Sequence, residues 1–288
     1  MWVVVINPIA GRGKGGRLGK IVTDFLETHG IVYQVVSGSS AVQTREHLQI
    51  VIESFACKGI IAVGGDGLVN LVVQEVARTS IPLLAIPAGT GNDFCRALGW
   101  SVDNVDEILN SMISNDPQPI DLGIANGSWF GAILSTGFDS VVNERANKMK
   151  WPRGPMKYNL AMLQALVGFK PRHYEIALDG NSFSSSAMLI AVGNGISYGG
   201  GMKVCPGARL DDGQFDVMIL KPISIFEFLR VFPKVYAGTH VSHPAVEIRR
   251  AKSVLLDAPA IAYADGERVG PLPISAECVS GALLTWVK

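Results

Sequence analysis

The chain has 288 residues, of which 48% are apolar and 17% are charged. This length corresponds to roughly two domains of about 150 residues each, and the high apolar and low charged fractions exclude a disordered chain. Lys and Arg together number 25, as do Asp and Glu, so no global positive field is available to hold a nucleic acid. Any contact with phosphate groups or with a lipid surface must therefore be local.

The cysteines and the N-terminal segment indicate a cytoplasmic protein. The four cysteines lie far apart and form no CxxC pair, which is typical of reduced thiols in the cytosol. The first eight residues contain neither a basic region nor a small-residue cleavage site, so we expect a strand there rather than a signal peptide. The uncharged stretch 180–202 is interrupted by polar residues and three consecutive glycines, and we expect no membrane-spanning helix.

The first 120 residues alternate short β-branched runs with helical patterns, which is typical of βαβ units and a mostly parallel sheet. The expected strands are residues 2–6, 31–36, 60–63 and 83–86. The expected helices are one that ends before Gly30, one at 42–56 and one at 67–78. The N-terminal part is therefore predicted to be an α/β domain.

From about residue 123 the pattern changes to short strands joined by turns, which predicts a mainly antiparallel β domain. The expected strands are residues 129–135, 174–178, 188–192, 215–220 and 245–248. Two helices are expected within this part, at residues 156–169 and 225–236. The fold class is thus an α/β domain followed by a β domain.

Glycines, 32 of the 288 residues, cluster after the predicted strands. The first cluster, 7–16, places Gly11, Gly13 and Gly16 in GxGxxG spacing, where residues without Cβ let backbone N–H groups approach an anion at a helix N-terminus. This spacing alone is weak evidence, because no acidic residue follows at the end of the second strand. A plain tight turn is the alternative.

Two further glycine-rich segments carry carboxylates. Residues 63–67 place Asp66 where a P-loop would carry a lysine, which makes sense beside a polyphosphate if a divalent cation lies between them. A capping Asp in a glycine turn is the alternative. Residues 87–94 add Thr90, Asn92 and Asp93. Because ligands bind at the carboxyl ends of the strands in open α/β sheets, the three turns together indicate a nucleotide site.

Several of these motifs recur together in one known family. The N-terminal part contains NPxxG at 7–11, GGDG at 64–67 and PAGTGNDF at 87–94. Further along the chain come DLG at 121–123, GFD at 137–139, YGGG at 198–201, DG at 212–213, FDV at 215–217 and DGE at 265–267. In this order they resemble the diacylglycerol kinase, sphingosine kinase and bacterial lipid kinase family. The resemblance covers nearly the whole chain and is nearest to the family's soluble bacterial members.

The resemblance implies two domains with the active site in the cleft between them. Residues 1–122 would form an ATP-binding α/β domain of the type shared with NAD kinases and phosphofructokinases. Residues 123–280 would form an all-β sandwich for the lipid substrate, and the segment at about 281–288 would return to the first domain as a strand. The ATP site implied by the motifs comprises Asn7, Gly11, Lys14, Thr44, Gly64, Gly65, Asp66, Gly67, Asn70, Thr90 and Asn92. A capping role in the first turn of a helix is an equally good interpretation of Thr44.

The resemblance also implies two magnesium sites. Asp66, Asp93 and Asp121 are expected to hold catalytic Mg²⁺ directly or through water. A structural Mg²⁺ is expected in a second-domain loop, at Asp212 and the backbone carbonyls of Arg209 and Gln214. A β-turn without metal is the alternative there, because one carboxylate makes a weak Mg²⁺ site.

A proton acceptor for the lipid hydroxyl is the last part that phosphoryl transfer needs. The family's DGE motif matches residues 265–267, and Glu267 is the favoured general base with Asp265 beside it. A simple hairpin turn is the alternative for this Asp-Gly dipeptide. The family pattern is broken at Leu68 and Leu71, which stand where other members carry Thr and Glu, so a hydroxyl and a carboxylate are lost near the expected phosphate site.

The expected activity is ATP- and Mg²⁺-dependent phosphorylation of a hydroxyl on diacylglycerol or a related lipid. A NAD kinase-like enzyme, which would share GGDG, and a nonenzymatic lipid-binding or regulatory protein are the alternatives. The partner is a membrane lipid, reached by transient peripheral contact at the cytoplasmic face of the inner membrane, and the sequence leaves a homodimer open. The segment 148–157 mixes Lys and Arg with Trp and Met, which predicts a membrane edge; a solvated loop is the alternative.

Overall fold

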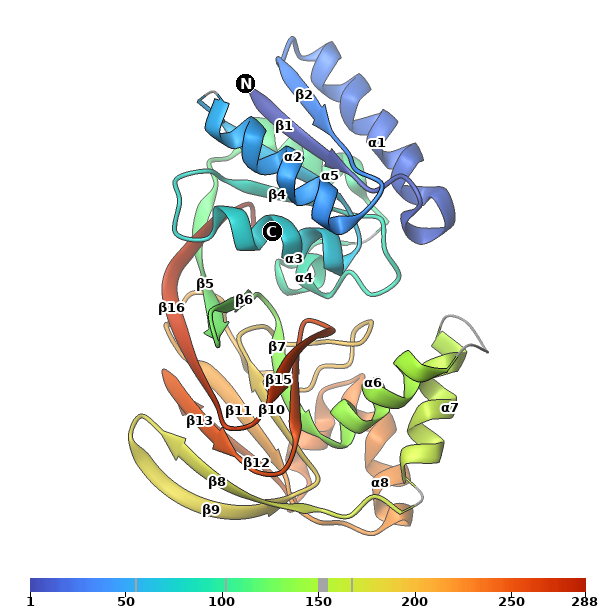
Figure 1. The fold of residues 1–288 in the computed structure, drawn as a ribbon, viewed down its shortest axis with the longest axis vertical. Coiled ribbons are helices and arrows are strands. Elements are labelled where there is room, and N and C mark those ends of the chain that lie inside the picture. The colour runs from blue at the N-terminus through green and yellow to red at the C-terminus, as the bar shows by residue number, and fades with distance from the viewer. Residues whose placement is uncertain (55, 102, 150–154, 167) are drawn as a thin grey trace.

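The computed structural model describes residues 1–54, 56–101, 103–149, 155–166 and 168–288. Figure 1 shows two regions, an N-terminal one of strands and helices and a C-terminal one built mainly of strands. The N-terminal strands are parallel and those of the second sheet are antiparallel. This arrangement confirms the fold class predicted from the sequence.

The N-terminal region is a parallel sheet with helices on both faces. The strand order is β2, β1, β3, β4, and the strands are Tyr33–Val36, Trp2–Ile6, Gly59–Gly64 and Leu83–Pro87. Helices α1 (Ala10–Thr28) and α5 (Val105–Ser114) contact each other on one face. Helices α2 (Ala41–Ser54) and α3 (Asp66–Val76) contact each other on the other face.

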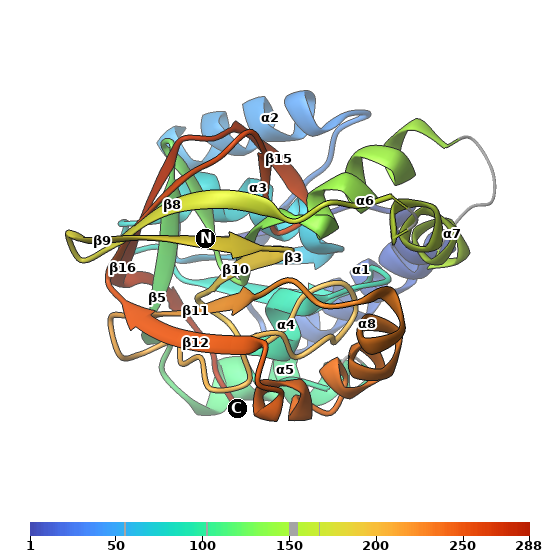
Figure 2. The ribbon, with the colours of Figure 1, turned by 90° about the horizontal axis from the view of Figure 1, so that it is seen from below.

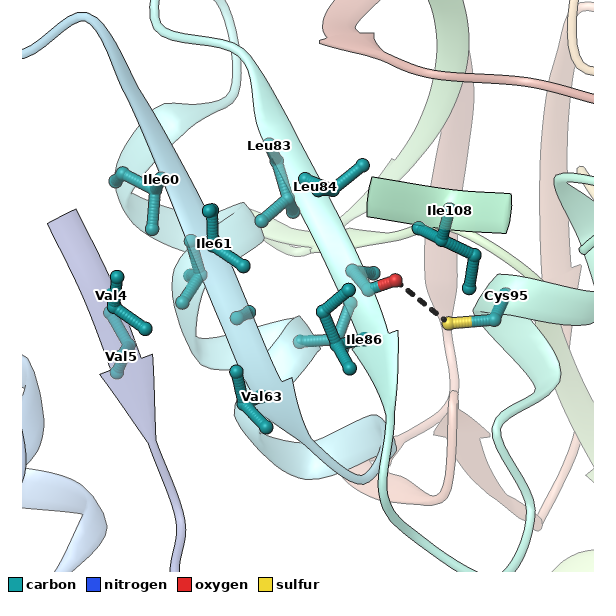
Figure 3. Packing of buried hydrophobic residues seen from close by; sticks show 14 of the residues in the cluster. Val4, Val5, Ile60, Ile61, Val63, Leu83, Leu84, Ile86, Cys95 and Ile108 are labelled. Carbon is teal, nitrogen blue, oxygen red and sulfur yellow. Dashed lines mark hydrogen bonds between the residues drawn. The ribbon is translucent and has the colours of Figure 1, made fainter. Parts of the chain in front are cut away.

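The strands of this sheet form the core of the N-terminal region (Figure 3). Residues 3–5, 60–63 and 83–86 are at most 2% exposed, as expected for strands that are covered on both faces and therefore read as continuous apolar runs. Beyond β4 the short helix α4 (Asp93–Ala97) is fixed against the sheet, and its Cys95 thiol lies 3.6 Å from the Ala85 carbonyl oxygen. Because β1, β3 and β4 are parallel, the turns that follow them leave the sheet at the same edge.

The C-terminal region is a β-sandwich. One layer has the order β12, β11, β10, β7, β14, β15, with strands Val246–Ala251, Phe215–Leu220, Leu189–Gly193, Ile133–Gly137, Ile261–Ala264 and Glu267–Pro271. The facing layer contains β16, β13, β8, β9, β5 and β6, which are Ile274–Thr285, Ser253–Asp257, Arg172–Leu178, Asn181–Ala187, Gln118–Ala125 and Ser128–Phe130. Tyr174, Phe130 and Phe215 are the largest fully buried side chains of this region.

Strand β16 joins the two regions. It pairs in antiparallel fashion with β13, and at its end Thr285 pairs in parallel with Leu83 of β4. Strand β5 runs alongside β16 and crosses the expected boundary at residue 122. The N-terminal sheet and one layer of the sandwich are therefore one continuous ten-stranded sheet.

Three helices cover the outer face of the six-stranded sheet. They are α6 (Phe138–Lys148), α7 (Pro155–Leu166) and α8 (Ile225–Val231), and the 3₁₀ turns η1 (Phe232–Val235) and η2 (Thr239–Ser242) follow α8. Figures 1 and 2 both show α6, α7 and α8 at one end of the molecule. Helix α6 was not expected from the sequence, so the description of this domain as all-β was incomplete.

Candidate active site

The three glycine-rich turns meet at the carboxyl ends of β1, β3 and β4. A Cβ built on Gly11 would collide with the carbonyl oxygen of Ala88, so the first turn packs directly against the third. A Cβ on Gly89 would lie 2.5 Å from the Cα of Gly65, so the second and third turns also touch. Backbone passes backbone at these positions, which only glycine allows. The expectation that these turns gather at one edge of the sheet is confirmed.

Gly11 and Gly13 form a matched pair for testing this packing. Both have left-handed backbone, with φ of 54° and 90°, so alanine at either position should lower the free energy of unfolding by about 1–2 kcal/mol. Only Gly11 also abuts Ala88, whereas no described atom lies within 4 Å of a Cβ on Gly13. We expect Gly11→Ala to be less stable than Gly13→Ala by roughly 1–3 kcal/mol in urea unfolding. Equal stabilities would contradict the close contact between the turns.

Asp66 and Asp93 face one small space beside these turns. The Asp66 carboxylate accepts the backbone N–H groups of Asn92 at 2.7 Å and of Asp93 at 2.8 Å. The Asp93 carboxylate accepts N–H groups of residues 200–201, which belong to the C-terminal region, at 2.9–3.1 Å. A Cβ on Gly91 would lie 2.7 Å from Asp66 Oδ2 and 3.2 Å from Asp93 Oδ2. Burial raises the pKa of Asp93, and repulsion by Asp66 contributes to the shift.

A third carboxylate, Asp265, comes from the turn between β14 and β15. Its Oδ1 accepts the N–H groups of Ala132 and Ile133, each at 3.0 Å, and its Oδ2 accepts that of Gly131 at 2.7 Å. Burial raises the pKa of Asp265 to about 6, and the negative charge of Asp66 adds to this shift. A carboxylate that titrates close to neutral pH is suited to accepting a proton in catalysis.

Glu267, the favoured base from the sequence, lies beside the second glycine turn, and its role as a base stays a prediction. It is exposed, and its Oε1 would lie 3.7 Å from a Cβ on Gly67, so it faces the second glycine turn. Among the described residues that line the cavity defined below, Asp265 is present and Glu267 is not. Of the two acidic residues of the DGE motif, the described lining of the cavity therefore contains Asp265.

Asp121, expected to share the catalytic Mg²⁺ with Asp66 and Asp93, holds two backbone segments together. Its Oδ2 accepts the N–H of Gly213 at 2.6 Å, and its Oδ1 accepts the N–H of Gly281 at 2.9 Å. The side chain is buried, and Asp121 is absent from the described lining of the cavity. The structure thus brings Asp66 and Asp93 together but gives Asp121 different partners.

In the loop predicted to hold a structural Mg²⁺, the Asp212 side chain already has protein partners. The Asp212 carboxylate pairs with Arg250, and its Oδ1 accepts the N–H of Gln214 at 3.1 Å. Arg209 turns outward to pair with Asp211 at 2.9 Å. Protein groups thus contact the Asp212 carboxylate, and Mg²⁺ binding at this loop stays a prediction.

Two other side chains of the predicted nucleotide site, those of Asn92 and Thr44, form hydrogen bonds with the backbone. The Asn92 side chain locks the third turn, since its Oδ1 accepts the N–H of Gly89 at 2.8 Å and its Nδ2 donates to the carbonyl of Gly89 at 3.0 Å. Buried Thr44 donates its hydroxyl to the Ser40 carbonyl at 2.9 Å, whereas the cap of this helix is Ser40, whose Oγ accepts the N–H of Gln43 at 3.2 Å. Asn7 is half-buried in the first turn, and Lys14 is half-buried directly after it.

The two leucines that depart from the family pattern have an apolar role. Leu68 and Leu71 both pack against the N-terminal core, and Leu68 covers Gly64 so closely that a Cβ there would lie 2.6 Å from Leu68 Cδ2. Asn70, between them, and Thr90 instead line the cavity. Although Leu68 and Leu71 are apolar, α3 and the third turn thus still place the polar side chains of Asn70 and Thr90 at the site.

A cavity of about 660 Å³ connects the three carboxylates to an apolar interior. Asp66, Asp93 and Asp265 line one end. The other end lies between the six-stranded sheet and the helices α6–α8, where the lining includes Met162, Leu189, Met218, Leu220, Phe228 and Phe232. This volume lies within the usual range for sites of small organic ligands. One space thus joins a charged site to an apolar pocket.

Two polar residues of this cavity were not singled out as site residues from the sequence. Neither carboxylate oxygen of Asp139, nor Nδ1 of His240, has a hydrogen-bond partner among the described residues, although both side chains are buried. Burial raises the pKa of Asp139 to about 6. The GFD motif at 137–139 was the available signal for Asp139. His240 lies in η2, where no motif pointed to it.

The membrane edge expected at 148–157 lies largely outside the described residues. Residues 150–154 are not described, and for 155–159 only the backbone is. Lys148 is exposed at the end of α6. Within the part of the chain that the structure describes, no helix combines the length and the apolar character needed to cross a bilayer.

Comparisons with known proteins agree with the two regions. Residues 1–125 match the family model of the diacylglycerol kinase catalytic domain, and residues 132–287 match that of the YegS C-terminal NAD kinase beta sandwich-like domain. A diacylglycerol kinase of Mycobacterium tuberculosis is 37% identical over 284 residues, which are 96% of this chain and 92% of that protein. One of Bacillus subtilis is 35% identical over 219 residues, 74% of this chain and 72% of that protein.

A solved structure shows the same fold. The crystal structure of a diacylglycerol kinase from Bacillus anthracis covers 100% of this chain with 96% of its own, at a TM-score of 0.79 and 24% identity. The family model over residues 132–287 and the curated relative from Mycobacterium tuberculosis point the same way as the motifs. The chain belongs to the diacylglycerol kinase family.

Proposed function

We propose that this protein is an ATP-dependent lipid kinase that transfers the γ-phosphate of ATP to a hydroxyl of diacylglycerol or a related lipid. The observation that carries the proposal is that one cavity has Asp66, Asp93 and Asp265 at one end and mainly apolar side chains at the other. A phosphate donor needs the first and an acyl chain needs the second. A NAD kinase-like enzyme would have no use for the apolar half.

The nucleotide would bind against the three glycine-rich turns, whose backbone can approach phosphates closely. Asp66 and Asp93, which face one space, fit Mg²⁺, because this ion is commonly held by one or two carboxylates together with substrate phosphates. The described residues contain no group of three His, Cys, Asp or Glu that could hold a metal, so the phosphates would complete the shell. Bound there, Mg²⁺ would neutralise charge on the transferred phosphoryl group.

Asp265 would act as the general base. As the lipid hydroxyl oxygen bonds to the γ-phosphorus, its proton passes to the Asp265 carboxylate, and the bond to the β–γ bridging oxygen breaks to release ADP. The three N–H groups of residues 131–133 fix the carboxylate in place. Because Asp265 belongs to the sandwich and Asp66 to the α/β region, the reaction would take place where the two regions meet.

Transfer of radiolabelled γ-phosphate to a panel of acceptors tests the proposal. The panel contains diacylglycerol, phosphatidylglycerol, sphingosine, undecaprenol and NAD, each with and without Mg²⁺. We expect labelled product from at least one lipid, only with Mg²⁺, and none from NAD. Product from NAD alone would establish the small-molecule kinase instead. No product from any acceptor, together with no ATP binding at millimolar concentration, would support a nonenzymatic protein.

A further inference from the structure

The segment formed by α8 and η1 is apolar on two opposite sides. Its inner side chains, Phe228, Val231, Phe232 and Val235, line the cavity. Its outer side chains are exposed, with Phe226 at 86% and Ile225 and Leu229 at 44% each, and Tyr236, which directly follows η1 at the cavity edge, is 53% exposed. A surface helix of a globular protein normally carries a single apolar stripe, and a contiguous exposed apolar patch marks an interaction site. We call these four exposed residues the α8 face.

Two exposed cations and one carboxylate, whose side chain is 43% exposed, lie beside the α8 face. Arg230 and Lys234 lie on the same segment and are both exposed. The acidic residue of the helix, Glu227, faces His243, with its Oε1 3.2 Å from His243 Nε2. Apolar side chains next to cationic ones are the composition of segments that lie in the interface of an anionic bilayer. Since the whole chain has no net charge, attraction to such a surface has to come from a local group like this one.

The cavity reaches the surface beside the α8 face. Tyr236 lines the apolar end of the cavity and is also 53% exposed. Figures 1 and 2 show α8 at the edge of the molecule next to α6 and α7. A chain that leaves a bilayer at this edge would enter the apolar end first, with its head toward the carboxylates.

We propose that the α8 face inserts into the interface of an anionic lipid bilayer, and that the lipid substrate enters the cavity beside Tyr236. The entry route rests on the proposed function; the membrane contact does not. The apolar side chains provide adhesion to any bilayer, and Arg230 and Lys234 add a preference for anionic lipids.

Sedimentation with vesicles tests the membrane contact on the full chain. The vesicles are pure phosphatidylcholine or an equal mixture with phosphatidylglycerol. We expect the double variant Phe226→Asp, Leu229→Asp to lose at least tenfold in partitioning to both. The pair Arg230→Ser, Lys234→Ser should lose about fivefold or more per charge on the mixed vesicles only, from roughly 1 kcal/mol per cation near an anionic surface. Val42→Asp, at a site 67% exposed on α2, is the matched control and should bind like the wild type.

Two further measurements separate the possible results. Kinase activity toward a short-chain diacylglycerol dispersed as monomers should persist in Phe226→Asp, Leu229→Asp while activity on vesicles falls; if no lipid is phosphorylated by the wild type, the proposed function fails and the vesicle result still stands. Unchanged vesicle binding of this variant would overturn the proposal. So would a wild-type dimer in analytical ultracentrifugation that the variant dissociates, because the α8 face would then be a subunit interface.

Discussion

Asp265→Asn is expected to lower kcat by about 10²–10⁴-fold, the range that a general acid–base group contributes, while ATP affinity changes little. The amide has nearly the shape of the carboxylate and keeps an oxygen for the N–H groups of Ala132 and Ile133. It cannot take up the hydroxyl proton, so the loss should fall on the chemical step. Steady-state transfer assays give kcat, and calorimetric titration gives the ATP dissociation constant.

Glu267→Gln is the matched control for this substitution. Glu267 is exposed. Of the DGE motif, Asp265 and Gly266 are in the described lining of the cavity, and Glu267 is not. We expect its removal to leave kcat close to the wild-type value. If Glu267→Gln abolished transfer and Asp265→Asn did not, the assignment based on the motif would hold and the one based on geometry would be wrong.

The pH profile gives a second check on Asp265. Its pKa is raised by burial from 3.8 to about 6, so the group is still protonated at a pH where an exposed Asp would be ionised. Activity should therefore be lost as pH falls through about 6, with kcat/KM decreasing about tenfold per pH unit below it. Asp139 has a similarly raised pKa and lines the same cavity, so the profile is repeated with Asp139→Asn. Persistence of the acid limb in that variant excludes Asp139 as its source.

The strand pattern of the chain was the most predictable part of the fold. β1 and β11 have the bounds expected from their apolar runs. The single strand expected at 129–135 is instead β6 and β7. The reason is long-range: the N–H groups of residues 131–133 are donated to Asp265, more than 130 positions along the chain. A local pattern carries no information on such a partner.

Two helices of the C-terminal region differ from the prediction: one was not expected, and the other is shorter than expected. Helix α6 is mostly polar and buries only Phe138, Asp139, Ser140 and Ala146, so it has no clear apolar stripe. The helix expected at 225–236 changes to a 3₁₀ turn at Phe232, next to Pro233, as expected where a proline removes a backbone donor.

The motifs predicted where the site lies, but they did not predict which partners each carboxylate binds. Asp66 and Asp93 lie after neighbouring parallel strands, so topology alone predicts their meeting. Asp121 also matches a family motif, yet its oxygens bind Gly213 and Gly281, which are 92 and 160 positions away. Asp265 and Glu267 are separated only by Gly266, and Asp265 has left-handed backbone with φ of 49°, so a local pattern does not predict which of the two carboxylates lines the cavity.

The second large effect is expected for Asp66→Asn. Loss of this charge leaves Asp93 as the remaining carboxylate of the pair that faces Gly91, so the Mg²⁺ concentration for half-maximal transfer should rise at least tenfold. The rate at saturating Mg²⁺ should fall about 10²-fold or more, because a bound metal stabilises the transition state by several kcal/mol. Removing the repulsion should also lower the pKa of Asp93 part of the way, since burial remains its main cause.

Asp121→Asn separates the two interpretations of the acidic residues. The amide can accept only one of the two N–H groups that the carboxylate now binds, and a buried donor left without a partner costs about 1–3 kcal/mol of unfolding free energy. We therefore expect lower stability in urea with an unchanged Mg²⁺ requirement for transfer. A requirement that rises as it does in Asp66→Asn would instead place Asp121 among the metal ligands, because a residue that only ties Gly213 to Gly281 has no means of changing metal affinity tenfold.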